Sequence, residues 1–342
     1  MDYQEKINIY VPDETRLQLK NDAELFEIFK RDRRTVNLNQ FLSLILCGYY
    51  DEYCRETREA YDAVMKILDS SPLKLGTREE IADRIVNQVI LPSVPKRNGK
   101  PSVSMSFKPT AKTEGIISSI EADLDEKDSF SRFFCRMLIS YCRKPITDRE
   151  KIVFRENYEK LKQACDEGKS VRFFTIWNNK QQFDVIPYAI TAGREEIYNY
   201  LIGEYIKPFA GQACTFRLNR IHRIAFGTTN KTISEEVRRH CDRMIATAPQ
   251  YPINADEKIC IRLNDKGEEF YHRFYYGRPS YDWIDNRDDG HYYNFSCSVM
   301  QAFHYFRRFD GSSAMVVYPL SLRDLIIKFH EDALKQYQTQ EE

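Results

Sequence analysis

Two short segments of the chain, residues 6–11 and 102–107, alternate strictly between apolar and polar side chains. Because successive side chains of a β-strand point to opposite faces, this alternation predicts two strands, each with one buried and one exposed face. The residues expected on the exposed faces are Lys6, Asn8, Tyr10, Ser102, Ser104 and Ser106. Each predicted strand is followed by apolar positions at helical spacing, so the order strand, helix, helix occurs twice.

Capping residues indicate where several predicted helices begin. Asn37 and Ser129 each stand directly before an apolar stripe, and their side-chain oxygens are good acceptors for the first helical N–H groups. The residues from Thr77 to Glu80 match a capping box. The helices expected in this half of the chain are 13–29, one from Asn37, 77–91, 111–124, one from Ser129, and a polar helix at 148–168.

Residues 171–226 change from helical to strand-like spacing. A run of β-branched and aromatic residues at 171–177 is expected to turn at 178–180 into a second run at 181–190. Further strands are expected at 196–202, 214–218 and 220–226. About five short strands in quick succession are typical of a small β-barrel.

The C-terminal part mixes both kinds of element. After a linking helix at 234–246, strands are expected at 258–263, 281–284, 291–297 and 314–318, with a turn at 285–290. Helices are expected at 265–276, 298–309 and 321–337. The resulting order, βαββαβ, is that of a ferredoxin-like domain. The predicted fold class is therefore α+β, with several domains.

Composition gives no sign of a membrane protein or of a uniformly charged surface. The 342 residues carry 51 Lys and Arg against 51 Asp and Glu, so any electrostatic site must be local. The longest apolar run, Phe41 to Leu46, is far below the ~20 residues of a membrane span, and no secretion signal is evident. Nine scattered cysteines favour reduced thiols and a cytoplasmic location.

Motifs for catalysis and metal binding are missing from the sequence. It has no CxxC, HExxH, nucleophile elbow or phosphate-binding glycine loop. Residues 285–290 resemble the start of a calcium loop, but Arg287 and Ser296 stand where ligands are needed. We therefore expect no cofactor, no metal site and no enzymatic activity.

A local excess of positive charge falls within the predicted barrel. Between Lys169 and Arg223 there are eight Lys and Arg residues against four acids. Arginine binds phosphate and aromatic rings stack on unpaired bases, so this region is a candidate site for a single strand. The candidate residues are Arg172, Tyr188, Tyr200, Arg217, Arg220 and His222. Alternatively, the tyrosines belong to the barrel core and the arginines are only solvated.

The two strand-helix-helix repeats resemble ribbon-helix-helix motifs. In that family two strands pair antiparallel and enter the DNA major groove, while helix N-termini hold phosphates. A lone strand would leave its backbone groups unpaired, so we expect the two copies to pair within one chain. On such a ribbon Lys6 is expected to meet a phosphate and Asn8 an adenine edge, whereas the three serines discriminate little. Alternatively, the ribbon is kept only for packing.

Three short motifs resemble the landmarks of WYL domains, namely IPY at 186–188, YNYLIG at 198–203 and FRLNRI at 216–221. This resemblance implies an Sm-like or SH3-like barrel of the kind that senses ligands or binds nucleic acid in prokaryotic regulators. The sequence departs from the family at Asn199, where the name-giving Trp would be, and at Thr175. Residues 294–319 are similar to the extension that follows WYL domains, which implies a homodimer formed through the C-terminal domain.

The whole organisation is most similar to the WYL accessory proteins of type VI-D CRISPR loci. That resemblance implies a non-enzymatic protein that binds single-stranded RNA and modulates an RNA-guided CRISPR effector nuclease. Two alternatives remain: a transcriptional regulator whose ribbon binds duplex DNA and whose barrel senses a ligand, or a scaffold that docks on a protein. The expected domains are ribbon-helix-helix-like units at 1–70 and 102–147, a connector with a basic loop at 71–101, a helix plus WYL barrel at 148–230, a linking helix at 231–252, and the ferredoxin-like dimerisation domain at 253–342.

Overall fold

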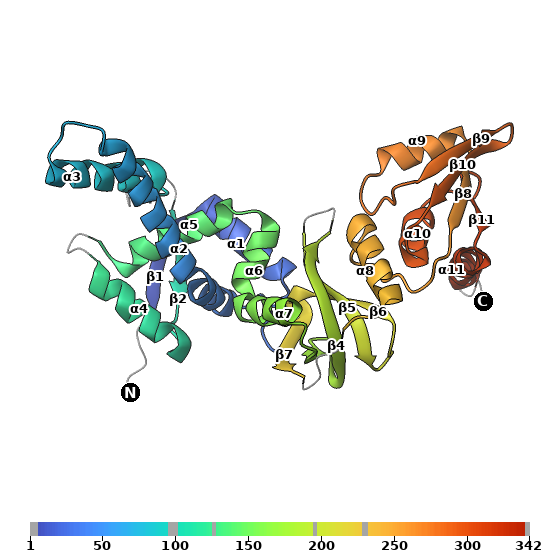
Figure 1. Cartoon of the computed structure of the whole chain (residues 1–342), viewed down its shortest axis with the longest axis horizontal. Coiled ribbons are helices and arrows are strands. Elements are labelled where there is room, and N and C mark those ends of the chain that lie inside the picture. Colours follow the sequence, from blue (N-terminus) through green and yellow to red (C-terminus); the bar gives the residue numbers. More distant parts are fainter. Residues whose placement is uncertain (1–5, 95–101, 125–127, 194–196, 228–231, 339–342) are drawn as a thin grey trace. The chain divides into compact units, whose positions relative to one another are not determined.

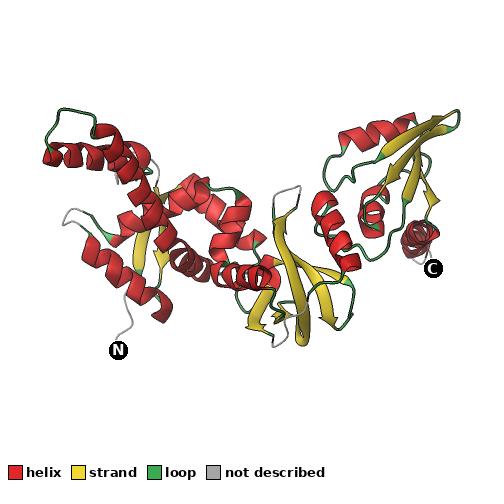
Figure 2. Cartoon of the chain, in the orientation of Figure 1, coloured by secondary structure: helices red, strands yellow, loops and turns green. Residues whose placement is uncertain are grey.

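The structure, a computed structural model, describes residues 6–94, 102–124, 128–193, 197–227 and 232–338 (Figure 1). The chain divides into two compact units, Met1–Glu156 and Asn157–Glu342. Within the described residues the fold is mixed α/β, with helices and three antiparallel sheets (Figure 2). The finer domain boundaries expected from the sequence stay a prediction, and each unit is described separately.

The first unit combines a two-stranded ribbon with helices. Its elements are β1 (Ile7–Pro12), α1 (Asp13–Leu25), α2 (Leu38–Leu68), α3 (Leu75–Ile85), a π-helical turn (Val86–Ile90), β2 (Ser102–Phe107), α4 (Ala111–Asp123), α5 (Phe130–Arg143), α6 (Ile146–Val153) and the start of α7 (Arg155–Glu167). Strands β1 and β2 pair antiparallel, with Asn8 opposite Ser106 and Tyr10 opposite Ser104. The predicted pairing of the two strands within one chain is confirmed.

The buried face of the ribbon closes one side of an apolar core. Ile9, Val11 and Phe107 are fully buried and pack with side chains from α1, α2 and α5. Each such side chain contributes roughly 1.5–3 kcal/mol by leaving water. Helices α2 and α5 begin where the capping residues predict, because Asn37 accepts from the Gln40 N–H and Ser129 accepts from the Arg132 N–H.

Three predicted helix boundaries in this unit are wrong. Helix α1 ends at Leu25, since Glu27 takes a positive φ of 61° and Phe29 forms a β-bridge with Val36. Helix α3 begins at Leu75 rather than Thr77, so the capping-box pattern lies inside its first turn. The polar helix expected at 148–168 is two helices, α6 and α7, which break at Phe154, whose ring packs edge-on against Phe26.

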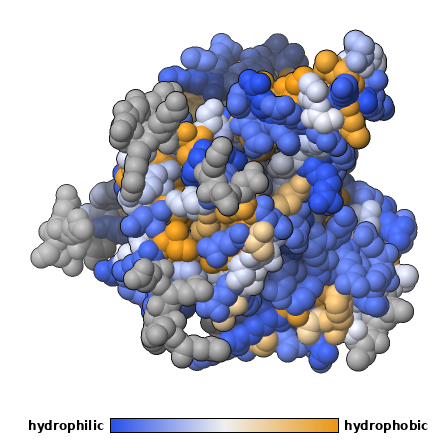
Figure 3. All heavy atoms as spheres, turned by 90° about the vertical axis from the view of Figure 1, so that its left-hand side faces the viewer, coloured by the Kyte–Doolittle hydropathy of each residue, from blue (hydrophilic) through white to orange (hydrophobic). Residues whose placement is uncertain are grey.

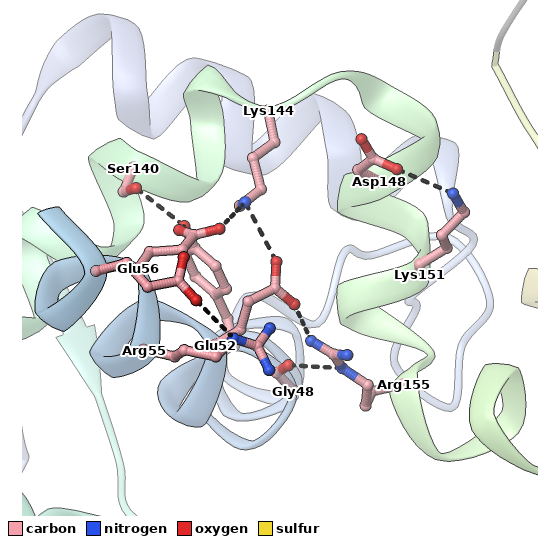
Figure 4. A network of polar contacts seen from close by, with 11 residues as sticks. Gly48, Glu52, Arg55, Glu56, Ser140, Lys144, Asp148, Lys151 and Arg155 are labelled. Carbon is pink, nitrogen blue, oxygen red and sulfur yellow. Dashed lines mark hydrogen bonds and ion pairs between the residues drawn. The ribbon is translucent and has the colours of Figure 1, made fainter. Parts of the chain in front are cut away.

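A network of charged groups ties α2 to the chain that follows α5 (Figure 4). The Lys144 ammonium lies 2.6 Å from a Glu56 carboxylate oxygen and 3.2 Å from one of Glu52. Burial alone would lower the pKa of Lys144, but the hydrogen bonds and charges of the two glutamates raise it. Arg155 donates to the Gly48 carbonyl at 3.1 Å and pairs with Glu52. These contacts hold α2 and the start of α7 together by charge.

A buried ion pair joins α1 to α6. The Arg149 guanidinium donates two hydrogen bonds to the Asp22 carboxylate, at 2.7 and 3.0 Å. The Tyr141 hydroxyl of α5 donates to the same carboxylate at 3.2 Å. Both charges are almost completely removed from water, so each depends on the other for stabilisation.

After α7, the second unit forms a five-stranded sheet, which is curved (Figure 2), in the order β6-β5-β4-β3-β7. Its elements are β3 (Val171–Thr175), β4 (Asn178–Ala192), β5 (Asn199–Lys207), β6 (Ala213–Arg217), a 3-10 turn (Leu218–Arg220) and β7 (Ile221–Phe226). Thr175 pairs with Asn178, so the hairpin turns at Ile176 and Trp177. The turn predicted at 178–180 is therefore wrong, because those residues already belong to β4. The start of the strand predicted at 196–202 lies partly outside the described residues.

One helix and a second sheet complete the unit. Helix α8 (Glu235–Thr247) is capped by Ser234 and packs on the first sheet through Val237, Cys241 and Met244. The remaining elements are β8 (Ile259–Leu263), α9 (Asp265–Arg273), β9 (Trp283–Arg287), β10 (Gly290–Phe295), α10 (Val299–Phe306), β11 (Ala314–Tyr318) and α11 (Leu320–Gln338). These elements follow one another along the chain in the predicted order. Their strands form a sheet in the spatial order β11-β8-β10-β9. The turn predicted at 285–290 shrinks to two residues, since β9 extends to Arg287.

The molecular face drawn in Figure 3 is mostly hydrophilic, with a few separate hydrophobic patches. Among the described residues, no helix combines the length and the apolar character that crossing a membrane requires.

Candidate nucleic-acid interface

A groove of about 390 Å³ opens beside the end of β6 in the second unit. Its lining combines two arginines with aromatic and amide side chains: Trp177, Tyr200, Arg217, Arg220, Gln250 and Tyr251. The first four come from the curved sheet and its turns, and the last two from the segment after α8. The groove therefore gathers residues from positions far apart in the sequence.

Local backbone geometry brings the two arginines together. Arg217 ends β6 and pairs across the sheet with Tyr200 on β5. The 3-10 turn then reverses the chain, so that Arg220 borders the same groove. The Arg220 carbonyl accepts a hydrogen bond of 3.0 Å from the Ile176 N–H, which fixes the hairpin turn that carries Trp177. The 3-10 turn and the hairpin turn therefore hold Arg217, Arg220 and Trp177 close to one another.

Each arginine lies beside an aromatic ring. The Arg217 guanidinium carbon is 4.1 Å from the centre of the Tyr198 ring, and that of Arg220 is 5.9 Å from the Trp177 ring. Cation–π contacts of this kind orient a planar guanidinium while leaving its edge for hydrogen bonds. Trp177 is 62% exposed, so much of a large aromatic side chain lies at the surface beside the groove. Across the described part of the chain, Arg217 forms no ion pair with a carboxylate.

The structure separates the six barrel residues predicted to bind nucleic acid. Tyr200, Arg217 and Arg220 line the groove, although Tyr200 is only 7% exposed. The rings expected beside the arginines were Tyr188, Tyr200 and His222, but the rings in cation contact with them are Tyr198 and Trp177. Proximity within the five-stranded sheet and its turns, not spacing along the chain, decides which rings reach the guanidinium groups.

The other three predicted barrel residues lie outside the groove. Arg172 is exposed on β3, opposite Asp184 of β4. The Tyr188 hydroxyl donates to the Asp242 carboxylate of α8 at 2.6 Å, so this side chain joins the helix to the sheet. His222 packs beside Phe174, and burial together with the Arg223 charge lowers its pKa. His222 is therefore neutral near pH 7.

The groove contains residues that sequence reasoning missed. The sequence pattern places Trp177 at the end of a predicted strand, but an indole next to two asparagines is itself a sign of an exposed turn. Tyr198, which contacts Arg217 beside the groove, is the first residue of the YNYLIG motif, and that motif predicts only the fold. Gln250 and Tyr251 carried no local signal, since they follow a linking helix and reach the groove only through tertiary packing.

The outer face of the ribbon forms a second candidate surface. Lys6, Asn8, Ser104 and Ser106 are exposed, while Tyr10 and Ser102 are half-buried. The Ser131 hydroxyl donates to the Asn8 carbonyl at 2.8 Å and so connects the start of α5 to β1. Lys6 is the one cation among the six predicted ribbon residues, and the strand β2 offers only hydroxyl groups.

Sites for metals and reactive thiols have little support in the described ranges. No group of three or more His, Cys, Asp or Glu side chains gathers there in a way that could hold a metal ion. Burial raises the pKa of the thiols of Cys135, Cys214 and Cys297, which keeps them protonated near neutral pH.

Comparison with known proteins gives a likeness at the level of fold. No family model matches the sequence, and no curated protein matches it. One solved structure, described as the crystal structure of a CRISPR Cas-related protein, aligns with a TM-score of 0.62 at 14% identity, covering 100% of this chain and 96% of that chain. The chain shares its fold with a CRISPR Cas-related protein. This likeness agrees with the CRISPR-associated resemblance seen in the sequence.

A second solved structure aligns more weakly. It is the proteasome accessory factor PafBC of Arthrobacter aurescens, with a TM-score of 0.25 at 12% identity, covering 98% of this chain and 51% of that chain. A score this low carries no argument about fold or function.

Proposed function

We propose that the protein is a non-enzymatic regulatory protein that binds single-stranded RNA in the groove beside β6 and modulates a type VI CRISPR RNA-guided nuclease in the cytoplasm. The observation that carries the proposal is the pairing of Arg217 with Tyr198 and of Arg220 with Trp177 around one groove. The likeness of fold to a CRISPR Cas-related protein supports it.

This proposal includes a finer assignment of the fold. We assign the ribbon and its helices to two ribbon-helix-helix-like units, and the curved sheet to an Sm-like or SH3-like WYL barrel. The C-terminal sheet we assign to a ferredoxin-like domain, because its strand order β11-β8-β10-β9 joins a βαββαβ chain. We further propose that this domain forms the homodimer contact.

The chemistry expected of the groove is sequence-tolerant binding. Arg217 and Arg220 would each neutralise a phosphate, and Trp177 would stack on a base. Stacking and charge neutralisation depend weakly on base identity, so the protein is expected to prefer unpaired strands over particular sequences. Neutralising phosphates releases counterions, so the affinity is expected to fall steeply as salt rises.

Binding of a fluorescent, unstructured RNA oligomer at several salt concentrations tests the proposal. The Arg217→Ala/Arg220→Ala variant is expected to bind at least about tenfold more weakly, with a log-log salt slope shallower by about 1.4, because each lost phosphate contact removes about 0.7. Arg16→Ala/Arg55→Ala, which removes two exposed arginines of the first unit, serves as the matched control. Equal affinity for the groove variant and the wild type would reject the groove as the RNA site.

A cleavage assay tests the modulator role. Collateral RNA cleavage by a type VI effector is expected to rise or fall when the protein is added, and the groove variant is expected to lose this effect. If the groove variant modulates cleavage as well as the wild type does, RNA binding in the groove is not how the protein acts.

A second candidate function is supported by the paired strands of the first unit. The antiparallel ribbon presents Lys6 and Asn8 beside Ser104 and Ser106, which suits a duplex major groove. A transcriptional regulator of this kind would lose duplex binding in Lys6→Ala/Asn8→Ala while keeping its affinity for single-stranded RNA. Absence of duplex binding by the wild-type protein at low salt would remove this candidate.

A further inference from the structure

The segment that follows α9 exposes an unusual number of large rings. In residues 272–281, called here the aromatic segment, four aromatic side chains are at least two-fifths exposed: Phe274 (46%), Tyr275 (63%), Tyr276 (64%) and Tyr281 (44%). Single exposed rings are common, but four within ten residues are an unusual concentration of exposed apolar surface. Such a concentration is typical of an interaction surface.

Arginines alternate with these rings along the segment, which contains no carboxylates. The aromatic segment contains Arg273 and Arg278 and no acid, although the chain as a whole has equal numbers of acids and bases. Arg278 lies 5.2 Å from the Tyr275 ring and Arg273 lies 6.0 Å from the Phe274 ring. Arg308, which follows the end of α10, donates to the Tyr276 carbonyl at 3.1 Å and adds a third cation.

Carboxylates do not neutralise these cations in the described part of the second unit. Arg273, Arg278 and Arg308 take part in no ion pair there, even though Glu269 lies one turn before Arg273 on α9. The other flanking acid, Asp282, accepts a 2.6 Å hydrogen bond from the Ser296 hydroxyl. Together with Arg308, the segment therefore combines exposed rings with three arginines that form no ion pair with a described carboxylate.

Hydrogen bonds to the backbone hold the aromatic segment in place. Arg278 donates to the Tyr271 and His272 carbonyls at 3.3 and 3.2 Å. The Tyr271 hydroxyl donates to the Pro279 carbonyl at 2.6 Å, and the Tyr305 hydroxyl donates to the Phe274 carbonyl at 2.7 Å. Because the backbone is fixed before any partner arrives, binding costs less conformational entropy.

Charge complementarity decides which partner suits this surface. Exposed rings alone would suit a protein or a nucleic acid, but cations without carboxylates favour a partner that carries both aromatic faces and negative charge. Unpaired nucleotides have this combination, since bases stack on rings and on guanidinium planes while phosphates bind arginine. We propose that the aromatic segment, together with Arg308, is a second contact surface for single-stranded nucleic acid.

A chain of contacts leads from the groove toward this surface. Tyr251, which lines the groove, stacks on His304 of α10 with 5.8 Å between the ring centres. Arg307 and Arg308 follow His304 by three and four residues, and burial together with their charges lowers the pKa of His304. Only the order of contact, groove first and aromatic segment second, rests on the function proposed above; the surface itself does not depend on it.

Oligomer length separates the two surfaces in a binding experiment. The probes are oligouridylates of about 8 and about 30 nucleotides, since one single-strand site covers about 4–16 nucleotides, and deoxyuridine oligomers of the same lengths. The variant Arg273→Ala/Tyr275→Ala/Tyr276→Ala is expected to bind the long oligomer at least about tenfold more weakly and the short one unchanged, because even one lost stack weakens binding by about that factor. The matched control is Lys328→Ala/Tyr337→Ala, which removes an exposed cation and an exposed ring from α11.

The outcomes distinguish this proposal from the proposed function. If the groove variant loses both oligomers and the aromatic variant loses neither, the second surface is rejected and the groove stands. If the aromatic variant loses the long oligomer while the groove variant binds normally, the groove is rejected instead. A change in oligomeric state without a change in affinity would assign the segment to a protein contact and overturn the proposal.

Photo-crosslinking of the wild-type protein gives a test that needs no variant. A long oligomer carrying 5-bromouridine is expected to label peptides that contain Tyr275 and Tyr276. Labelling confined to the groove, with none on the aromatic segment, would contradict the proposal.

Discussion

The Arg217 guanidinium lies over the ring of Tyr198, with 4.1 Å between its central carbon and the ring centre. The two residues come from β6 and from the residue directly before β5, so the contact spans neighbouring strands. It holds the cation beside a ring, at the groove that both arginines border.

Removing the Tyr198 ring is expected to weaken RNA binding more than removing its hydroxyl. The Tyr198→Leu variant should bind single-stranded RNA about two- to fivefold more weakly, the value of an exposed cation–π contact. Tyr198→Phe keeps the ring and should bind nearly as the wild type does. Fluorescence anisotropy measures both affinities, and equal losses in the two variants would show that the ring does not position Arg217.

Gly48 is expected to be essential for the packing of α2 on α6. A Cβ atom at this position would lie 2.0 Å from the Ile152 carbonyl oxygen, so Gly48→Ala must push the two helices apart. We expect a loss of about 1–3 kcal/mol in the free energy of unfolding. Gly115 of α4 has open space around it, so Gly115→Ala should stabilise by about 0.5–1 kcal/mol. Chemical denaturation measures both, and equal stability of the two variants would contradict this packing.

The buried pair Asp22–Arg149 is expected to dominate the polar contribution to the first unit. Asp22→Ala should reduce the free energy of unfolding by about 3–5 kcal/mol, because it leaves the Arg149 charge buried without its partner. Asp13→Ala breaks the exposed pair with Arg16 and should cost at most about 1 kcal/mol. Denaturant titrations check both values. If Asp22→Ala lowers the free energy of unfolding by no more than Asp13→Ala does, water solvates the Arg149 charge.

The loop before α2 is expected to have a pH dependence set by Asp32. Its carboxylate accepts from the Thr35 hydroxyl at 2.6 Å and from two backbone N–H groups, which lowers the pKa of Asp32 from 3.8 to about 2. These bonds therefore stabilise the loop fully above about pH 4, and their contribution is lost as the pH falls toward about 2.

Carboxyl NMR during an acid titration measures this pKa directly. Thr35→Val removes the bond that contributes most and should raise the pKa of Asp32 toward its ordinary value. Thr57→Val deletes a hydroxyl of α2 that bonds to the Tyr53 carbonyl instead, and it should leave the titration of Asp32 unchanged. An Asp32 that titrates normally in the wild type would show that the loop is open in solution.

The first unit was largely predictable because its signals are local. Strict alternation fixed which side chains of residues 6–11 and 102–107 are buried, and the need to pair two lone strands predicted the ribbon. Asn37 and Ser129 marked helix starts because capping needs only the next three residues. The predicted helix ends were wrong where tertiary packing ends a helix, as at Phe154, whose ring packs edge-on against Phe26.

The candidate groove was only half predictable. Arg217 and Arg220 stood out because a local charge excess is visible in the sequence. The aromatic residues that contact these arginines did not stand out in the sequence. The hairpin turns at Ile176 and Trp177 rather than at the asparagines, which brings Trp177 to the groove. Tyr198 reaches Arg217 from the residue before a neighbouring strand. The pair Gln250 and Tyr251 reaches the groove through the docking of α8 on the sheet, for which no short-range pattern exists.

Ile7 lies opposite Phe107 in the ribbon. During synthesis the first strand therefore emerges from the ribosome long before its partner exists, and three helical segments must be made in between. Any truncated product that stops short of Phe107 would keep a bare β-edge with an apolar face, the kind of edge that recruits other chains into aggregates. Proteolysis or premature termination within the first hundred residues should thus yield insoluble fragments, whereas cuts after Phe107 leave the ribbon complete.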